Sequence, residues 1–492
     1  MSLPRLRAAS LQFETLPKPD TESDSRTGAK TVEVAGPLKT TLLLLEDGGL
    51  RICLVTTHFG WTTPANVCDV FRQAVAKELD LPTSHVLMFS SHNHCCVAFA
   101  SNAVQAYGSY GQDIPAAELL PVGKQFLNAC CDHARRLPEL LEPVQVWWAE
   151  GQEGRITYNR KGRHADGSSY LMREQDRLLL GKDFNGDIDR QTPVVTFRNS
   201  SGNTVAALAQ FTGHPVTAYH PERPVVFGEW PQVACDIVGD HLSSESKVPV
   251  GFLQGCAADV NSKEMLCGTV ERSTQFGRML GESYIEALRE LRPSVRDGMN
   301  FSTETVNLPL APLPAREVLA AELQEMVDFI QRANAGDEDT LFCVGQNYPE
   351  SLSPPFRVGL VEMIRRWNVW ALEVHDSGRA DSVATELGLE VAVIRIGDVG
   401  IVGMSCEPFQ EIGRQIRRTS PLPLSIPCGY TNVSHGYITD SGNTGGQEYM
   451  SAHYRYTKFR PPLQKPAGDV LAEHAIRILN SFAEAWPQPD AS

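Results

Sequence analysis

Short apolar runs and stretches with a helical period follow one another along the chain. Two apolar runs, residues 41–45 and 51–56, flank Asp47-Gly48-Gly49, and this spacing predicts a β-hairpin. Apolar residues then recur every three to four positions over residues 67–79, which indicates a helix. Thr63-Pro64 supplies the expected N-cap and first-turn proline. Together these segments predict a hairpin that leads into a helix.

The same order of strand and helix recurs through the rest of the sequence. Further strands are expected at residues 85–89, 193–197, 204–211, 248–253, 389–396 and 399–404. Further helices are expected at residues 116–141, 233–243, 274–291, 315–335 and 469–485. This alternation predicts an α/β fold in which mixed β-sheets are flanked by helices.

Three segments lack a clear period. Residues 17–30 are rich in polar side chains and predict a solvated loop. Residues 158–189 and 423–462 are long for loops of a compact domain, and long ordered loops frequently carry function. These two loops are therefore expected to contribute to a site.

Histidines follow two of the predicted strands. His92 and His94 come directly after one strand, and in an extended chain their side chains project to the same side. His214 follows another strand, which Pro215 prevents from continuing. Ligands of open α/β sheets bind outside the carboxyl ends of strands, so these histidines indicate a metal or catalytic site. Ordinary hydrogen-bonded histidines, or His220 in place of His214, are the alternatives.

Carboxylates stand at two further strand ends. Glu407 follows a predicted strand and precedes a short helical pattern. Glu407 has two possible roles. Its carboxylate either interacts favourably with the positive end of the helix dipole or is a third metal ligand beside two histidines. That ligand set leaves one zinc coordination position open for water. Asp259 follows another strand and is expected either to orient a ligand imidazole or to cap its loop. The predicted site therefore lies where several strands end.

The amino-acid composition of the chain disfavours several classes of function. The 492 residues include 44 basic and 59 acidic side chains, and the net charge of -15 disfavours nucleic acid as a partner. No run of about 18 apolar residues occurs, so no membrane span is expected. The first residues lack the apolar core of a secretory signal, and the 12 cysteines form neither a C-x-x-C zinc motif nor a disulfide framework. We therefore expect a cytoplasmic protein that acts on a small molecule, and its oligomeric state stays open.

Several separated motifs resemble, in the same order, those of the neutral, non-lysosomal ceramidases, which are zinc amidases that cleave the N-acyl bond of ceramide. The resemblance covers residues 40–462. The motifs are Ser91-His92-Asn93-His94, Asn159-Arg160, Gly213-His214-Pro215-Val216-Thr217, Gly228-Glu229, the stretch from Gly403 to Arg414 around Glu407, the stretch from Asn432 to Thr439, and Tyr449. They are similar to the family's S/T-H-T-H-S-G, N-R-S, H-P-T-S, G-D or S-D, P-G-E-F-x-x-x-x-G-R-R and N-x-Y-x-x-Y-I-T patterns.

The resemblance implies roles for particular residues. It implies a zinc site made by side chains from four motifs, namely His92, His214, Glu407 and Tyr437. It implies three side chains around the substrate carbonyl, namely His94 as proton acceptor with Arg160 and Tyr449 beside the oxyanion. It also implies a hydrolase domain over residues 39–492, preceded by an N-terminal extension and entry strand over residues 1–38. The additional C-terminal β-sandwich domain of typical ceramidases is not expected.

Departures from the family pattern bear on the substrate. Asn261 stands where the family has a serine, Cys95-Cys96 replaces a small Ser-Gly pair, and Ser434 replaces a tyrosine. Residues 158–189 carry many charges, which suit a polar substrate or a solvated rim. The expected function is thus a zinc-dependent amidase that uses metal-activated water on a substrate smaller or more polar than ceramide. An ester, lactone or glycosidic-bond hydrolase, and a non-catalytic zinc or small-molecule binding protein, are the alternatives.

Overall fold

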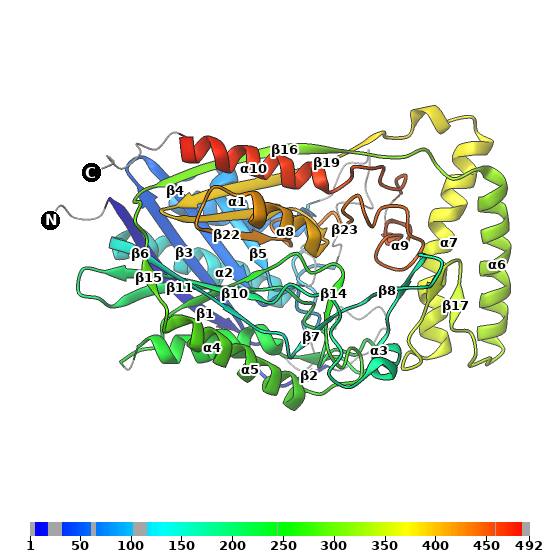
Figure 1. The fold of residues 1–492 in the computed structure, drawn as a ribbon, viewed down its shortest axis with the longest axis horizontal. Coiled ribbons are helices and arrows are strands. Elements are labelled where there is room, and N and C mark those ends of the chain that lie inside the picture. Colours follow the sequence, from blue (N-terminus) through cyan, green and yellow to red (C-terminus); the bar gives the residue numbers. More distant parts are fainter. Residues whose placement is uncertain are drawn as a thin grey trace.

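The structure is a computed structural model that describes residues 5–17, 32–60, 65–101, 116–243, 245–457 and 459–484. Thr63, Pro64 and nearly all of the expected loop at residues 17–30 lie outside the described part of the chain. Within it, two β-sheets stack on each other and helices cover their outer faces (Figure 1).

The larger sheet contains nine of the described strands. Its order is β13-β11-β10-β6-β1-β3-β4-β5, and β15 pairs with β6. The strands are β1 (Leu6–Thr15), β3 (Leu38–Asp47), β4 (Leu50–Thr57), β5 (Val86–Ser90), β6 (Glu142–Gln152), β10 (Gln191–Asn199), β11 (Thr204–Phe211), β13 (Val250–Gln254) and β15 (Arg292–Pro293). The β4–β5 and β11–β13 pairs are parallel, and the other pairs are antiparallel. The sheet curls, so that the Thr41 hydroxyl of β3 donates to the Val250 carbonyl of β13 at 3.2 Å.

The leucines of β3 explain why this sheet is covered on both faces. Leu42 and Leu44 pack against helices α1 (Ala65–Leu79) and α2 (Pro121–Arg136), whereas Leu43 and Leu45 pack against the second sheet. Successive residues of a strand face opposite sides, so four consecutive leucines require an apolar layer on each side. All four are at most 1% exposed.

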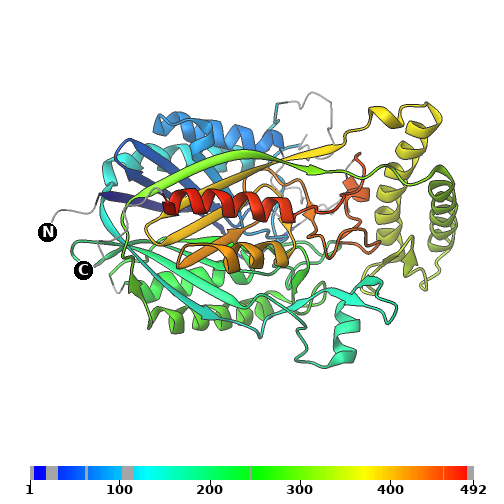
Figure 2. The ribbon, with the colours of Figure 1, turned by 45° about the horizontal axis from the view of Figure 1, so that its top comes forward.

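The second sheet has the order β16-β19-β20-β22 and faces the first. Its strands are β16 (Met299–Pro309), β19 (Glu386–Ile396), β20 (Val399–Met404) and β22 (Leu424–Cys428). Helices α8 (Gln410–Thr419) and α10 (Asp469–Glu484) cover its outer face, while α4 (Glu229–Leu242) and α5 (Val270–Leu288) cover β10, β11 and β13 of the larger sheet (Figure 2). These helix, sheet, sheet and helix layers confirm the predicted α/β class with mixed sheets flanked by helices. No helix in the described residues is long and apolar enough to cross a bilayer.

A helical hairpin extends from one end of the layers (Figure 1). It consists of α6 (Arg316–Asn334) and α7 (Pro354–Asp376), with β17 (Phe342–Cys343) and β18 (Gln346–Asn347) between them and η4 (Ala380–Ser382) after them. The whole excursion leaves the second sheet after β16 and returns at β19, where Pro309 pairs with Glu386. Short α9 (Tyr454–Thr457) packs against α7, and Ala452 lies in the same apolar cluster as Trp367.

The two long segments without a period contain short elements. These are β7 (Thr157–Asn159), β8 (Lys161–Arg163), β9 (Ser169–Leu171) and α3 (Glu174–Leu180) in the first, and β22, β23 (Tyr437–Ile438) and α9 in the second. The remaining short elements are β2 (Glu33–Val34), η1 (Thr83–His85), η3 (Leu137–Leu140), β12 (Val225–Val226), β14 (Val260–Ser262) and β21 (Glu407–Pro408). The two long segments are thus ordered by short ladders, some of which pair with distant parts of the chain, and both segments contribute residues to the cavity described below.

Candidate metal centre and active site

Two short pairings bring predicted ligands together beyond the ends of the long strands. β21 pairs with β23 in parallel, so that Glu407 lies opposite Tyr437. His214, shortly after β11, forms a single β-bridge with Asn261 of β14. The backbone thus places residues that are far apart in the sequence at one end of the two stacked sheets.

The side chains of His92, His214, Glu407 and Tyr437 converge there. Glu407 Oε2 lies 3.3 Å from His92 Nε2 and 3.6 Å from His214 Nε2. Tyr437 Oη lies 3.4 Å from His214 Nε2. His92, His214 and Glu407 are 2%, 1% and 3% exposed, so their donor atoms face one another inside the protein. Two imidazoles and one carboxylate form the donor set that catalytic zinc sites use.

His94 lies at the edge of this cluster and lines a cavity. Its Nε2 is 3.3 Å from His92 Nε2, and its ring meets Tyr219 edge-on with centroids 4.8 Å apart. One ligand atom from each of His92, His94 and His214 lies within 4.8 Å of the other two, and His94 is the one of the three that is not fully buried. An imidazole that reaches a cavity can exchange a proton with a bound molecule, as a general base must.

Backbone contacts fix the tautomer of His214. Its Nδ1 donates to the carbonyl of Ala257 at 2.7 Å, because a carbonyl can only accept. In the neutral ring, Nε2 therefore keeps its lone pair toward Glu407 and Tyr437. Burial, followed by the charge of Arg160 and the neighbouring imidazoles, lowers the pKa of His214 well below its ordinary value. His214 is thus held as a neutral potential ligand.

Gln254, which the sequence analysis did not single out, joins the two histidine segments. Its side-chain amide donates to the carbonyl of Ser91 at 2.8 Å and to that of Gly213 at 2.9 Å, the residues just before His92 and His214. Gln254 is fully buried. In the sequence, only its position at the end of a predicted strand pointed to Gln254. Its two hydrogen bonds join segments that are distant in the chain, so no local pattern reveals them.

The segment around His92 is held in an unusual conformation. His92 has a φ of 63°, in the left-handed region, and its ring lies over Tyr430 with centroids 4.2 Å apart. Asn93 donates to the carbonyls of His58 and Phe227, at 2.9 and 2.8 Å. Strained backbone of this kind persists where surrounding contacts determine it and is frequent at functional sites. Tyr430 and Asn93 are further site residues that the sequence analysis left without a role.

Arg160 reaches the same cluster from the segment after β7. Its Nη2 donates to Tyr437 Oη at 3.0 Å and to His214 Nε2 at 3.2 Å, and its Nε donates to the Ala258 carbonyl at 2.9 Å. The guanidinium therefore places a buried positive charge beside the convergent donors. Its bond to His214 uses the lone pair that a metal ion requires, so the two contacts exclude each other.

Two residues from the sequence hypotheses are not brought to the cluster. The Asp259 carboxylate accepts from the backbone and side-chain amides of Gln410, at 2.8 and 3.2 Å, and caps α8. The Ala257 carbonyl takes the place expected for Asp259 beside the imidazole of His214. Burial raises the pKa of Asp259 to about 6. His220 faces the Ser351 carbonyl instead, and so His214 alone of these two histidines joins the cluster.

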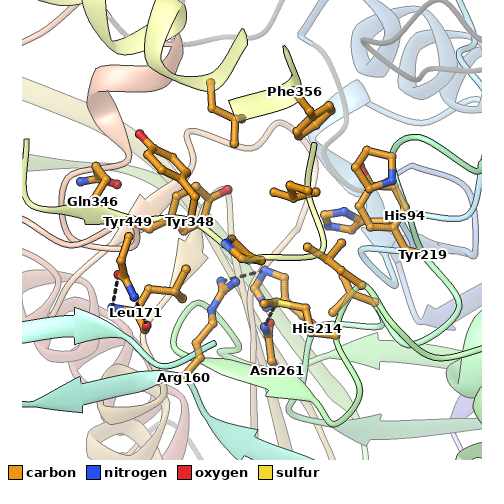
Figure 3. Close-up of a pocket in the computed structure, with 18 of the residues that line it drawn as sticks. His94, Arg160, Leu171, His214, Tyr219, Asn261, Gln346, Tyr348, Phe356 and Tyr449 are labelled. Atoms are coloured by element: carbon orange, nitrogen blue, oxygen red, sulfur yellow. Dashed lines mark hydrogen bonds between the residues drawn. The ribbon is translucent and has the colours of Figure 1, made fainter. Parts of the chain in front are cut away.

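An apolar cavity of about 140 Å³ opens from the cluster (Figure 3). Arg160 and His214 lie on one side of it and Phe356 of α7 lies across from them. Tyr449 lines the cavity and lies under the Arg160 guanidinium, 5.8 Å from its Cζ to the ring centroid. Most of the far wall comes from the helical excursion, namely Tyr348, Pro349, Leu352, Phe356 and Leu360.

The charged residues of segment 158–189 mostly face away from this cavity. Only Arg160 and Leu171 of the segment line it. Other charges form ion pairs, which are Arg173 with Asp176 at 2.8 Å, Arg177 with Glu174 at 2.6 Å and Lys161 with Glu448 at 3.0 Å. Apart from Arg160, the charges of the segment therefore lie outside the cavity, which is lined mainly by apolar and aromatic groups.

Comparison with protein-family models and with curated proteins found no match. Among solved structures, the neutral ceramidase from Pseudomonas aeruginosa matches 100% of this chain and 76% of its own, with 16% identity and a TM-score of 0.64. A ceramidase complexed with C2 matches 100% of this chain and 77% of its own, with 15% identity and a TM-score of 0.65. The resemblance carried by the separated motifs is thus matched in three dimensions, and the chain has the fold of the neutral ceramidases.

Proposed function

We propose that this protein is a zinc-dependent hydrolase that cleaves an N-acyl amide bond. The observation that carries the proposal is the convergence of three buried side chains: the Nε2 atoms of His92 and His214 lie 3.3 and 3.6 Å from the Glu407 carboxylate. This donor set fits zinc. His92, His214 and Glu407 would hold the ion, with the Tyr437 hydroxyl as a fourth ligand.

A zinc ion bound there supplies a Lewis acid that lowers the pKa of water toward about 7 and polarises a carbonyl. His94 is the side chain that accepts and returns protons in this proposal. Its Nε2 stands beside His92 and its ring lines the cavity, so it can accept a proton from the attacking water. The same nitrogen returns the proton to the leaving amine as the C–N bond breaks. No serine nucleophile is required, in agreement with Asn261 at the family's serine position.

Arg160 and Tyr449 serve the oxygen of the substrate carbonyl. The Arg160 guanidinium is a permanent cation that already donates to Tyr437 at 3.0 Å, and the Tyr449 ring lies beneath it. When His214 binds a metal, the Nη2 proton now directed at His214 becomes available to an oxygen that gains negative charge. Fixed donors of this kind favour the tetrahedral state over the planar amide.

The cavity favours an apolar acyl group. Its far wall is made of aromatic and aliphatic side chains from α7 and the segment before it. An acyl chain that enters it leaves water, which contributes about 0.8 kcal/mol per buried methylene. The polar-substrate expectation rested on charges in residues 158–189, of which only Arg160 lines this cavity, and so we assign the acyl side of the substrate to this cavity.

The test is turnover by purified protein with a panel of N-acyl amino acids, N-acyl sugars, short esters, lactones and ceramide, with and without chelator. We expect amide cleavage that stops on zinc removal and returns on zinc addition. Cleavage of only esters, lactones or glycosides would replace the amidase assignment. Zinc binding without any turnover would make the protein a binding protein.

His220→Ala provides a matched control for His214→Ala. Both histidines belong to the segment after β11, but His220 lies away from the convergent donors. His214→Ala should lose zinc and turnover together, whereas His220→Ala should keep both. Equal losses in the two variants would contradict the ligand assignment.

A further inference from the structure

A buried ion pair joins the segments that carry Arg160 and Tyr449. Lys161 Nζ lies 3.0 Å from Glu448 Oε1, and these side chains are 5% and 0% exposed. Lys161 opens β8, whereas Glu448 belongs to the segment after β23. Glu448 lies outside the family motifs, whereas Lys161 stands at the serine position of the N-R-S pattern, and the sequence analysis treated it only as part of a charged loop.

Both charges are fully supplied with partners. The hydroxyls of Ser169 and Ser451 donate to the Glu448 carboxylate, and Lys161 Nζ also donates to Ser451 Oγ at 3.0 Å. Burial alone would raise the pKa of Glu448, but Lys161 and the two hydroxyls outweigh it and lower that pKa. The pair is therefore charged and specifically oriented.

The backbone also makes room for this pair. A side chain at Gly446 would bring its Cβ to 2.3 Å from Glu448 Oε2 and to about 3 Å from the hydroxyls of Ser169 and Ser451. Gly446 thus permits the segment to pack directly against the carboxylate. Any larger residue at position 446 would displace the carboxylate, so this packing requires glycine there.

Each residue of this pair is adjacent in sequence to a residue that lines the cavity. Arg160 precedes Lys161, Tyr449 follows Glu448, and the Arg160 Cζ lies 5.8 Å from the centroid of the Tyr449 ring. Arg160 is also held by Asp259 and Met172 through its backbone, at 2.9 and 2.7 Å. The Tyr449 segment has no paired strand of its own among the described residues, so side-chain contacts hold it: this ion pair links it to the Arg160 segment, and Gln346 donates to the Gln447 carbonyl.

We propose that Lys161 and Glu448 are positioning residues that fix Arg160 and Tyr449 relative to each other and so set the geometry of the carbonyl-binding side of the site. This inference rests on the proposed hydrolase function. Lys161 and Glu448 contact each other and the hydroxyls of Ser169 and Ser451, so we expect them to act on orientation and not on metal binding. A misplacement of about 1 Å in such a site can reduce turnover about 100-fold.

The test compares Lys161→Met with Lys161→Arg and with Glu174→Gln. Glu174 forms a comparably buried ion pair with Arg177 in the same segment, with side chains 9% and 3% exposed, but it lies within α3. We expect Lys161→Met to lower kcat about 100-fold at unchanged zinc content, Lys161→Arg to restore most of it, and Glu174→Gln to keep the wild-type kcat. Equal kcat values for Lys161→Met and Glu174→Gln would overturn the proposal.

Amide hydrogen exchange gives a second readout that does not depend on turnover. In Lys161→Met we expect faster exchange across residues 443–456, whereas Glu174→Gln should affect only residues near α3. Unchanged exchange at 443–456 would overturn the proposal even if the wild type hydrolyses no substrate in the panel. If Lys161→Met does not fold, Glu448→Asp, which shortens the pair by one methylene, is measured against the same expectations.

Discussion

Glu407 and Tyr437, which belong to two different motifs of the sequence, lie directly opposite each other in the parallel β21–β23 pair. A ladder of only two residues thus aligns a carboxylate and a phenol with two imidazoles. Because the pairing is made by backbone hydrogen bonds, either side chain can be changed without removing the register that holds the other.

Glu407→Gln should release zinc, and Tyr437→Phe should weaken its binding less. The carboxylate supplies a negative charge, whereas burial raises the pKa of the Tyr437 hydroxyl well above its usual value and keeps it protonated without metal. Zinc retained after dialysis against a graded chelator measures both effects. A greater loss of zinc from Tyr437→Phe than from Glu407→Gln would mean that the tyrosine contributes more to zinc binding than the carboxylate.

His94→Ala should retain zinc and lose turnover. A general base contributes about 10²- to 10⁴-fold, and His94 is placed beside the donor set without completing it. Metal content and kcat are measured on the same preparation. Loss of zinc in proportion to activity would instead make His94 a ligand, since its nitrogen is close enough to the other two imidazoles.

Gln254→Leu should weaken zinc binding about 10- to 100-fold, because the carbonyls before His92 and His214 lose their common donor. Gln232→Leu is the matched control. Its amide also bridges two backbone groups, at Pro37 and Lys39, which belong to neither histidine segment. Both variants should lose stability in denaturant unfolding, and only Gln254→Leu should change zinc affinity in a competition titration.

Stability should fall as the pH drops from about 6.5 toward 4, in part because of His58. Burial lowers the pKa of His58 to about 4, so the folded state excludes a proton that the unfolded chain accepts below its ordinary value. Above about pH 6.5 this effect costs no stability, whereas at pH 5 it lowers the free energy of unfolding by about 2 kcal/mol. In urea unfolding at pH 7 and pH 5, His58→Phe should lose about 2 kcal/mol less than the wild type. An equal loss in both would exclude His58 as the source.

Phe356→Trp should shift the preference toward shorter acyl chains. Phe356 lies across the cavity from Arg160 and His214, so a larger ring shortens the space for the chain (Figure 3). Each methylene denied burial costs about 0.8 kcal/mol, or about fourfold in kcat/KM. A series of acyl lengths on one amine measures the shift. An unchanged optimum would mean that the acyl group binds elsewhere.

The strand-end histidines and Glu407 could be found from sequence because each follows a strand whose apolar run is continuous. Strands 204–211 and 399–404 coincide with β11 and β20. Both are buried on two faces, so their hydrophobicity leaves little ambiguity. Helix α2, expected over residues 116–141, begins at Pro121 and ends at Arg136, since boundaries depend on caps that a periodic pattern does not define.

Other elements were missed for identifiable reasons. β22 contains Pro427, which argues against a strand, yet β22 is at the edge of its sheet, where proline is tolerated. Helix α7, which was not predicted, begins with the Ser353 cap and Pro354 at its first position, and both are helix-start signals. Gln254 and the Lys161–Glu448 pair act through partners distant in the sequence, and no local pattern identifies such partners.

The far wall of the cavity comes from an excursion between two adjacent antiparallel strands, whose ends meet where Pro309 pairs with Glu386. A segment inserted at such a point can be lengthened, shortened or exchanged while both strands keep their register. The convergent donors His92, His214 and Glu407 lie outside this insert, whereas the insert supplies a large part of the cavity wall. Under the proposed function, selection can therefore retune which molecules fit the cavity by replacing this one module, without displacing the convergent donors.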